Sequence, residues 1–317
     1  MLQNRAEVLN RCLRVFGSLH RNRSRSGYAP HKPILLLAIL DQIERGQIRE
    51  NRVAVTPELV ATFRAYWRAL VPEGAWVDRI VYPFRYLIRD GFWKLTKDGR
   101  PLGSEELGNP TSSVQLVALI DEAQLAEDLW ELIQDKAAIR LLRSHLLATY
   151  FGRQSEDVAA LVPAKPLDYE ISRLMREAHG RFRPRMVRER QDDGSYIRHA
   201  LFPRVVNGLY GYCCSVCGLG TCAQSGAAIV DAVHILPFAQ FHNDDPRNGI
   251  SLCKNHHWGF DHGWFALDNQ FKLIVSPLVA NAHEYAAQGS SFRLPSEPRC
   301  APAVEAITWH RKNVFLR

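Results

Sequence analysis

Residues 229–262 read IVDAVHILPFAQFHNDDPRNGISLCKNHHWGFDH and determine the architecture of the C-terminal half of the chain. The segment opens with a short apolar run that ends in His234, which is typical of a strand. A polar loop follows and holds Asn248. The next apolar run leads into a helical segment that carries His256 and His257. This order of strand, loop and helix, with imidazole and amide groups at fixed places, predicts a small metal-binding unit.

Two pairs of potential zinc ligands surround this segment. Cys214 and Cys217 form a CxxC pair upstream, and Cys253 and His256 form a CxxH pair. A structural zinc takes four tetrahedral sulfur or nitrogen ligands, and a spacing of three residues on a tight turn or first helical turn brings two side chains to one point. The segment between the pairs must return the chain, as a β-hairpin does. The spacing therefore predicts structural Zn2+ held by these four residues.

The cysteine content agrees with metal binding. The chain has 7 cysteines, an odd number, and four of them lie within residues 213–222. This pattern indicates metal ligation in a reducing compartment rather than a disulfide framework. Cys213 and Cys222 are left over, and their spacing suits a ligand less well. The alternative interpretation is a set of free buried cysteines with a chance CxxH.

Composition limits the class of protein. A chain of 317 residues is long enough for two domains, and 46% hydrophobic residues indicate a globular protein. The longest apolar run, residues 34–40, is too short to span a bilayer, and residues 1–12 lack the apolar core of a secretory signal. We therefore expect a cytoplasmic protein without a membrane partner. The formal charge of +7 favours a polyanionic partner.

The order of motifs in residues 214–262 resembles the HNH endonucleases, which carry a ββα-metal site. Hydrolysis of a phosphodiester requires a base that activates water and a cation that neutralises the developing charge. The resemblance implies that His234 is the general base and that Asn248 fixes the loop and orients the base. It also implies that His257 binds a catalytic Mg2+ or Mn2+. Family members often have cysteine where this chain has His256.

The two adjacent histidines can serve different metals, because neighbouring helical side chains point about 100° apart. Asp231 is the first carboxylate candidate for the ion that His257 binds. On a regular strand, however, Asp231 and His234 point to opposite faces, and unless a bulge intervenes Asp231 has a structural role instead. Asp261, one helical turn after His257, is a second candidate. Its alternative role is a helix-end cap or hydrogen-bond partner.

Apolar periodicity predicts an α+β protein: a mostly helical N-terminal recognition domain with a small sheet, followed by a zinc-braced ββα domain. Closely spaced prolines at 163 and 166 indicate a linker. We therefore predict a recognition domain over residues 1–160, a linker with a basic helix over 161–190, and a nuclease domain over 191–317. Expected helices include residues 34–44, a helix starting at Thr56-Pro57, two helices within 123–151 divided near Asp135, 197–209 and 303–315. Expected strands include 92–95 and a hairpin of 264–267 with 271–275.

The first half resembles, at residues 29–37, 82–84 and 90–93, the sulfur-binding domains of phosphorothioate-dependent restriction endonucleases. A phosphorothioate replaces one non-bridging oxygen with sulfur, which is larger and less strongly hydrated. Its recognition requires an apolar pocket rimmed by cations. The resemblance implies a pocket lined by three residues of one segment and contacts from a basic pair. These residues are Tyr82, Pro83 and Tyr86, with His31 and Lys32.

Two features of this half permit other interpretations. The family has a small residue near the position of Tyr86, and residues 82–84 would also suit ordinary aromatic packing at a turn. The basic segments 20–27 and 173–190 are either DNA contacts or solvated surface.

These observations together predict a modification-dependent restriction endonuclease. It would bind double-stranded, phosphorothioate-modified DNA and cleave it with Mg2+ or Mn2+. A homodimer would let two copies cut both strands. Three alternatives stay open: an HNH nuclease that reads another mark such as methylated cytosine, a non-enzymatic zinc-containing DNA-binding protein, and an RNA substrate.

Overall fold

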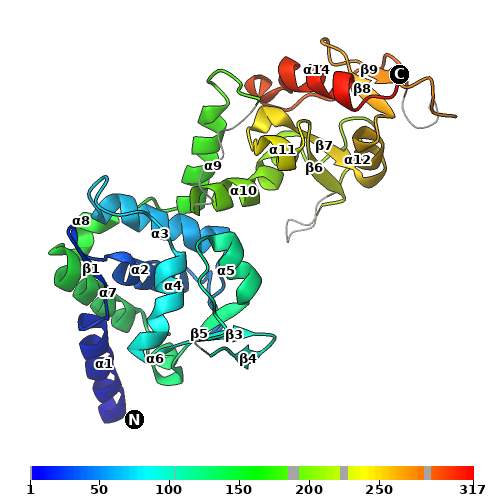
Figure 1. The fold of residues 1–317 in the computed structure, drawn as a ribbon. Helices are drawn as coiled ribbons and strands as arrows, with labels where there is room; N and C mark the ends of the chain where they lie inside the picture. Colours follow the sequence, from blue (N-terminus) through cyan, green and yellow to red (C-terminus); the bar gives the residue numbers. More distant parts are fainter. Residues whose placement is uncertain (1, 104, 185–192, 222–227, 282–286) are drawn as a thin grey trace. The chain divides into compact units, whose positions relative to one another are not determined.

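The computed structural model describes residues 2–103, 105–184, 193–221, 228–281 and 287–317 (Figure 1). Helices and small antiparallel sheets make up the fold, which confirms the predicted α+β class. The chain divides into two compact units, Met1–Tyr169 with Arg190–Ile197 and Glu170–Glu189 with Arg198–Arg317. The domain boundaries expected near residues 160 and 190 stay predictions. Over the described ranges, no helix is both long and apolar enough to cross a membrane.

Unit 1 consists mainly of helices. Their bounds are α1 (Leu2–Gly17), α2 (His31–Glu44), α3 (Pro57–Leu70), α4 (Val81–Tyr86), α5 (Ser113–Leu119), α6 (Glu127–Leu132), α7 (Lys136–Phe151), α8 (Ser155–Ala159) and the 3-10 helix η1 (Leu87–Asp90). Helix α2 packs against α3, α4 and α7 (Figure 1), and its side chains from residues 31 to 43 are buried. A helix that is apolar on nearly every face requires such surroundings. Thr56 caps α3 by accepting a hydrogen bond from Leu59 N, as its position before Pro57 predicts.

A three-stranded antiparallel sheet completes unit 1. Its order is β4 (Arg100–Pro101), β3 (Trp93–Lys97) and β5 (Glu122–Leu125), and a separate hairpin joins β1 (Arg23–Ser24) to β2 (Gly27–Tyr28). Residues 122–125 are therefore a strand, where we expected the start of a helix. Ala123 and Leu125 are buried while their neighbours are half-exposed, which is a period of two rather than 3.6. Pairing with β3 determines the conformation of this short segment.

Unit 2 is built on a ββα arrangement. Strands β6 (Val230–His234) and β7 (Gly249–Cys253) pair antiparallel, and helix α12 (Lys254–Asp261) packs on both. The remaining elements are α11 (Phe238–Phe241), η2 (Pro246–Asn248), β8 (Phe265–Leu267), β9 (Leu273–Val275), η3 (Pro298–Cys300) and α14 (Val304–Asn313). The predicted β8–β9 hairpin and closing helix are thus confirmed. Helices α9 (Pro166–Glu177) and α10 (Asp193–Leu209) each begin in unit 1 and end in unit 2.

Close packing fixes β7 against helix α10. A side chain at Gly249 would place its Cβ 2.4 Å from Val206 Cγ2 and 2.9 Å from Phe202 Cζ. Only glycine leaves room for this approach. Gly249 pairs directly with His234, so the packing of Gly249 against α10 also positions the end of β6.

Candidate active site and metal centre

Four residues from two segments bring their ligand atoms together. Cys214 and Cys217 lie in the turn after α10, Cys253 ends β7, and His256 lies in the first turn of α12. The four donor atoms all lie within 4.8 Å of one another. His256 Nδ1 is 3.1 Å from Cys253 Sγ and 3.5 Å from Cys214 Sγ. Cys217 Sγ is 4.0 Å from Cys253 Sγ.

These separations fit a tetrahedral zinc site. Zinc–sulfur bonds of about 2.3 Å at tetrahedral angles place two sulfur ligands about 3.8 Å apart, and a sulfur and a nitrogen slightly closer. The structure thus brings together all four residues that the spacing predicts. Cys213 lies outside the group, with its Sγ 3.4 Å from Gly211 O. Cys222 lies outside the described residues.

The ring of His234 is held on two sides at the end of β6. Its Nε2 lies 2.9 Å from Asp244 Oδ1. Its plane stacks on Phe202, with the centroids 3.8 Å apart and the planes 5° apart. No hydrogen-bond partner of Nδ1 is found among the described residues, and the side chain is 16% exposed. The imidazole therefore has one nitrogen engaged and one open.

Asn248 is fully buried and connects the two segments around His234. Its Oδ1 accepts a hydrogen bond from Leu236 N at 2.8 Å, and its Nδ2 donates to Leu236 O at 3.2 Å and to Asn243 O at 2.9 Å. These bonds tie the residues after β6 to the loop that precedes η2. Asn248 thus acts on the loop backbone, and the side chain that hydrogen-bonds the His234 ring is that of Asp244.

His257 lies between two carboxylates. Its Nδ1 is 2.9 Å from Asp231 Oδ2, and its Nε2 is 3.2 Å from Asp261 Oδ2. The hydrogen bond with Asp261 and the one with Asp231 raise the pKa of His257 despite partial burial. Burial raises the pKa of Asp231, but the ion pair with Lys254 at 2.6 Å and the contact with His257 outweigh it and lower that pKa. The structure therefore brings the two predicted ion ligands, Asp231 and His257, into direct contact.

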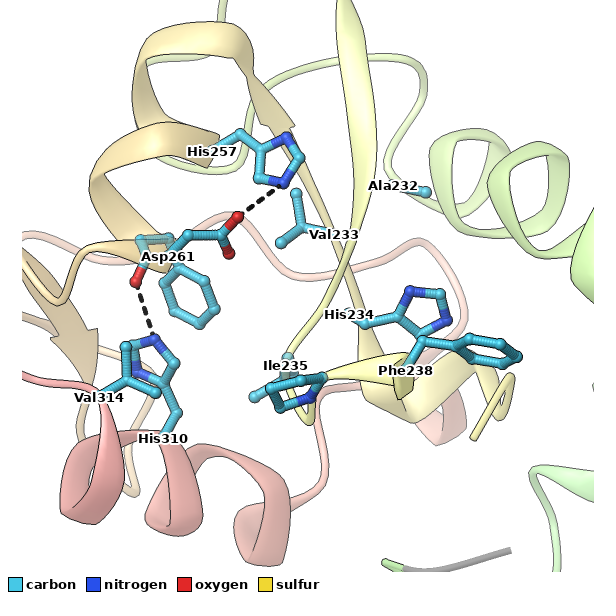
Figure 2. A pocket seen from close by; sticks show the side chains of 11 residues that line it. Ala232, Val233, His234, Ile235, Phe238, His257, Asp261, His310 and Val314 are labelled. Carbon is cyan, nitrogen blue, oxygen red and sulfur yellow. Dashed lines mark hydrogen bonds and ion pairs between the residues drawn. The ribbon is translucent and has the colours of Figure 1, made fainter. Parts of the chain in front are cut away.

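His234, His257 and Asp261 line one pocket of about 380 Å3 (Figure 2). Figure 2 shows the two histidine rings on different sides of β6, with His257 beside Asp261 and His234 beside Phe238. The pairing of β6 with β7 is continuous from Val230 to His234, so the strand has no bulge. Side chains therefore alternate between the faces, and the expected opposition of Asp231 and His234 is observed.

The far wall of this pocket contains a third histidine, His310 of α14. Its ring stacks on Phe260 with the centroids 3.7 Å apart, and its Nε2 lies 2.9 Å from Phe260 O. Burial lowers the pKa of His310 to about 4, so the ring is neutral at physiological pH. The wall thus adds no positive charge near His257.

In unit 1 the predicted basic pair is buried. Lys32 Nζ lies 2.6 Å from Asp90 Oδ2, and these two side chains are only 8% and 2% exposed. His31 Nε2 lies 2.9 Å from Val77 O, and its ring packs against Trp67. Both residues are therefore committed to partners inside the unit.

The predicted pocket residues of α4 divide between surface and interior. Tyr82 is exposed, Tyr86 is half-buried and Pro83 is buried. The guanidinium groups of Arg85 and Arg89 lie over the Tyr86 ring, 4.9 and 5.4 Å from its centroid. These arginines were not among the predicted site residues, although their alternation with tyrosines in the sequence was the available signal.

Two family models match the chain. Residues 214–268 match the HNH endonuclease family, and residues 9–163 match the ScoMcrA-like DNA sulfur-binding domain. Along the chain, a match to a ScoMcrA-like sulfur-binding domain therefore precedes a match to an HNH endonuclease domain. Both resemblances noted in the sequence are thereby confirmed. The matched range spans the positions of the four predicted zinc ligands and of His234, Asn248 and His257, whose roles stay predictions.

Three solved structures are among those similar to the chain. The modification-dependent TagI restriction endonuclease is 25% identical over 36% of this chain and 38% of its own, with a TM-score of 0.30. The sulfur-binding domain of ScoMcrA, complexed with phosphorothioated DNA, is 26% identical over 49% of this chain and 92% of its own, with a TM-score of 0.33. The type IV phosphorothioation-dependent restriction endonuclease ScoMcrA is 14% identical over 78% of this chain and 93% of its own, with a TM-score of 0.35. The chain spans less than half of the TagI structure, and no curated protein matches it significantly.

Proposed function

We propose that this protein is a modification-dependent restriction endonuclease. Residues 9–163 bind phosphorothioate-modified double-stranded DNA, and the ββα unit hydrolyses a phosphodiester bond. The observation that carries the proposal is the presence of both matched domains in one chain, with His234 and His257 lining one pocket of the HNH domain. Cutting both strands would use two copies, and the predicted homodimer stays a prediction.

His234 is the general base of the proposed reaction. Neutral imidazole accepts a proton near physiological pH, and the open Nδ1 is the nitrogen that can take it from water. The contacts of Nε2 with Asp244 and of the ring with Phe202 hold this nitrogen in place. Asn248 supports the same geometry through the backbone of the loop.

The second part of the site suits a hard divalent cation. Asp231, His257 and Asp261 offer carboxylate oxygens and an imidazole nitrogen, a donor set that accepts Mg2+ or Mn2+. When bound, such an ion stabilises negative charge on the phosphate and the leaving oxygen. His257 and Asp261 line the pocket, whereas Asp231 is paired with Lys254. Asp231 is thus placed to orient His257 as well as to share the ion.

Zinc has a structural part in this proposal. The four-residue cluster ties the turn after α10 to the start of α12, which is the helix that carries His257. Because such ligand sets form only in the folded chain, the free energy of zinc binding contributes to folding. Zinc would therefore set the position of the catalytic helix without contacting the substrate.

The proposed recognition surface lies on α4 and η1. Tyr82 presents an exposed ring for the sulfur. Pro83 and Tyr86 follow it on α4, where Arg85 and Arg89 lie over the Tyr86 ring. Arg85 and Arg89 have no carboxylate partner among the described residues, and their charges are suited to the flanking phosphates. His31 and Lys32 then support this surface from inside the unit.

Binding of paired duplexes tests the proposed target. The two duplexes have one sequence and differ only in a phosphorothioate at one position of each strand. We expect the full chain to bind the modified duplex at least about tenfold more tightly. Equal affinity would contradict the proposed mark, and a duplex with methylated cytosine would then test the alternative. Cleavage that continues in EDTA would contradict a metal-dependent nuclease.

A further inference from the structure

Asp244 is a buried carboxylate that contacts two histidines. Its Oδ1 lies 2.9 Å from His234 Nε2 and 3.7 Å from His199 Nδ1. Burial raises the pKa of Asp244, but the contacts with His199 and His234 outweigh this effect and lower the pKa. Asp244 is therefore an anion at neutral pH, and it lies directly behind the base of the proposed reaction.

The loop that carries Asp244 is held from both ends. Asn243 is fully buried, accepts a hydrogen bond from Asp245 N at 2.9 Å and donates one to Arg183 O at 2.9 Å. Asn248 Nδ2 donates to the backbone oxygen of Asn243 at 2.9 Å. The position of the Asp244 carboxylate is thus fixed by the backbone on each side of it. This gives Asn248 a physical route to His234, through the loop and Asp244.

The contact also defines the tautomer of His234. A carboxylate accepts hydrogen bonds, so Nε2 carries the proton and Nδ1 has the lone pair. Stacking on Phe202, with the planes 5° apart, opposes rotation of the ring out of this plane and so keeps Nε2 at Asp244. An imidazole that is held in this way is ready to accept a proton at Nδ1 only.

We propose that Asp244 is a positioning residue of the nuclease, which fixes the tautomer of His234 and stabilises its protonated form. This inference rests on the proposed function. Water gives a proton to Nδ1 as its oxygen bonds to phosphorus, and the bond from phosphorus to the leaving sugar oxygen breaks. That oxygen takes a proton from solvent, and His234 returns its proton to solvent. The Asp244 carboxylate, which does not change its own protonation, balances the positive charge in between.

Asp244→Asn tests the role, because asparagine keeps the size of the side chain and removes the charge. We expect the cleavage rate with Mn2+ to fall roughly 100-fold or more, while DNA affinity and zinc content stay unchanged. Asp244→Glu should restore part of the rate.

His199→Gln is the matched control. It removes the other histidine from Asp244 and leaves the bond to His234, so the rate should change by no more than a few-fold. A normal cleavage rate in Asp244→Asn would overturn the inference and leave the nuclease proposal standing. Normal cleavage by His234→Ala would instead overturn the nuclease proposal.

If Asp244→Asn does not fold, a second measurement tests the same inference. Nitrogen-15 NMR of the wild-type protein reports which nitrogen of His234 carries the proton, with His234→Gln used to assign its signals. A proton on Nε2 is the expected result. A proton on Nδ1 would overturn the inference, because that nitrogen could not then accept one from water.

Discussion

Asp231 Oδ2 lies 2.9 Å from His257 Nδ1, on the face of β6 opposite to His234. The residues proposed to hold the ion and the proposed base therefore come from opposite faces of one strand. They meet because His234 is the last residue of β6, where the pocket reaches both His257 and His234. Regular strand geometry thus places the proposed ion ligand and the proposed base on opposite faces of β6. Both still reach one pocket, because His234 lies at the end of the strand.

Substitutions of the two adjacent histidines should separate the two metals. His256 points to the cysteine cluster and His257 to the two carboxylates. We expect His257→Ala to retain zinc and a near-normal Tm while it loses cleavage and the binding of Mn2+. His256→Ala should lose zinc and melt at lower temperature. Elemental analysis and isothermal titration with Mn2+ measure both effects, and loss of zinc from His257→Ala would contradict the assignment.

Zinc should support the fold of unit 2. Purified protein should contain about one zinc per chain, and Cys253→Ser should reduce this content and lower the Tm by more than about 10 °C. Cys213→Ser is the control, because Cys213 lies beside the cluster but outside it. A protein that contains no zinc and is fully folded would refute the site.

Lys32 should act through stability rather than through phosphate contact. Its ion pair with Asp90 is almost fully buried, so Lys32→Met leaves a buried carboxylate without its cation. Unfolding in denaturant should show a loss of about 3–5 kcal/mol. The double variant Lys32→Met/Asp90→Asn should recover part of the lost free energy of unfolding, because the uncompensated charge of Asp90 is removed.

Arg85→Ala provides the contrast to Lys32→Met, since Arg85 lies at the surface of α4 and bonds Asn109 Oδ1 at 2.6 Å. DNA binding should weaken without a change in stability, and the dependence of affinity on salt should become less steep. If Lys32→Met weakened DNA binding with its stability intact, Lys32 would be a direct contact.

His310 should make the protein less stable in acid. Burial lowers its pKa to about 4 in the folded state, whereas the unfolded chain takes up the proton near its ordinary value of 6.5. Stability should therefore fall as pH falls from about 6.5 to 4, by roughly 3 kcal/mol for this group. His310→Phe keeps the ring on Phe260 and cannot titrate, so its stability should depend less on pH in that window. Chemical denaturation at several pH values compares the two proteins, and identical slopes would contradict the pKa.

Local spacing explains which parts of the structure were predictable. The CxxC and CxxH pairs place their ligands on single turns, and the apolar run of α2 requires burial whatever surrounds it. The cap at Thr56 is local in the same sense. The order of motifs along the chain indicated the HNH resemblance, and the family match over residues 214–268 agrees with it, while the roles of His234, Asn248 and His257 stay predictions.

The remaining features depend on contacts that spacing does not specify. The burial of Lys32 could not be foreseen because it depends on Asp90, 58 residues away in the chain, and its role as a DNA contact stays a prediction. Asp244 was missed because its direction depends on the loop after α11, where His242 takes a left-handed conformation with φ of 49°. The short β5 was predicted as helix because its pairing with β3 lies outside the local window.

Cleavage of a phosphorothioate-modified plasmid in Mn2+, by the wild-type chain and by His234→Ala, tests the central claim most directly. We expect linear product from the modified plasmid with the wild type only, none from the unmodified plasmid, and unchanged DNA binding by His234→Ala. Linear product formed by His234→Ala at the wild-type rate would contradict it.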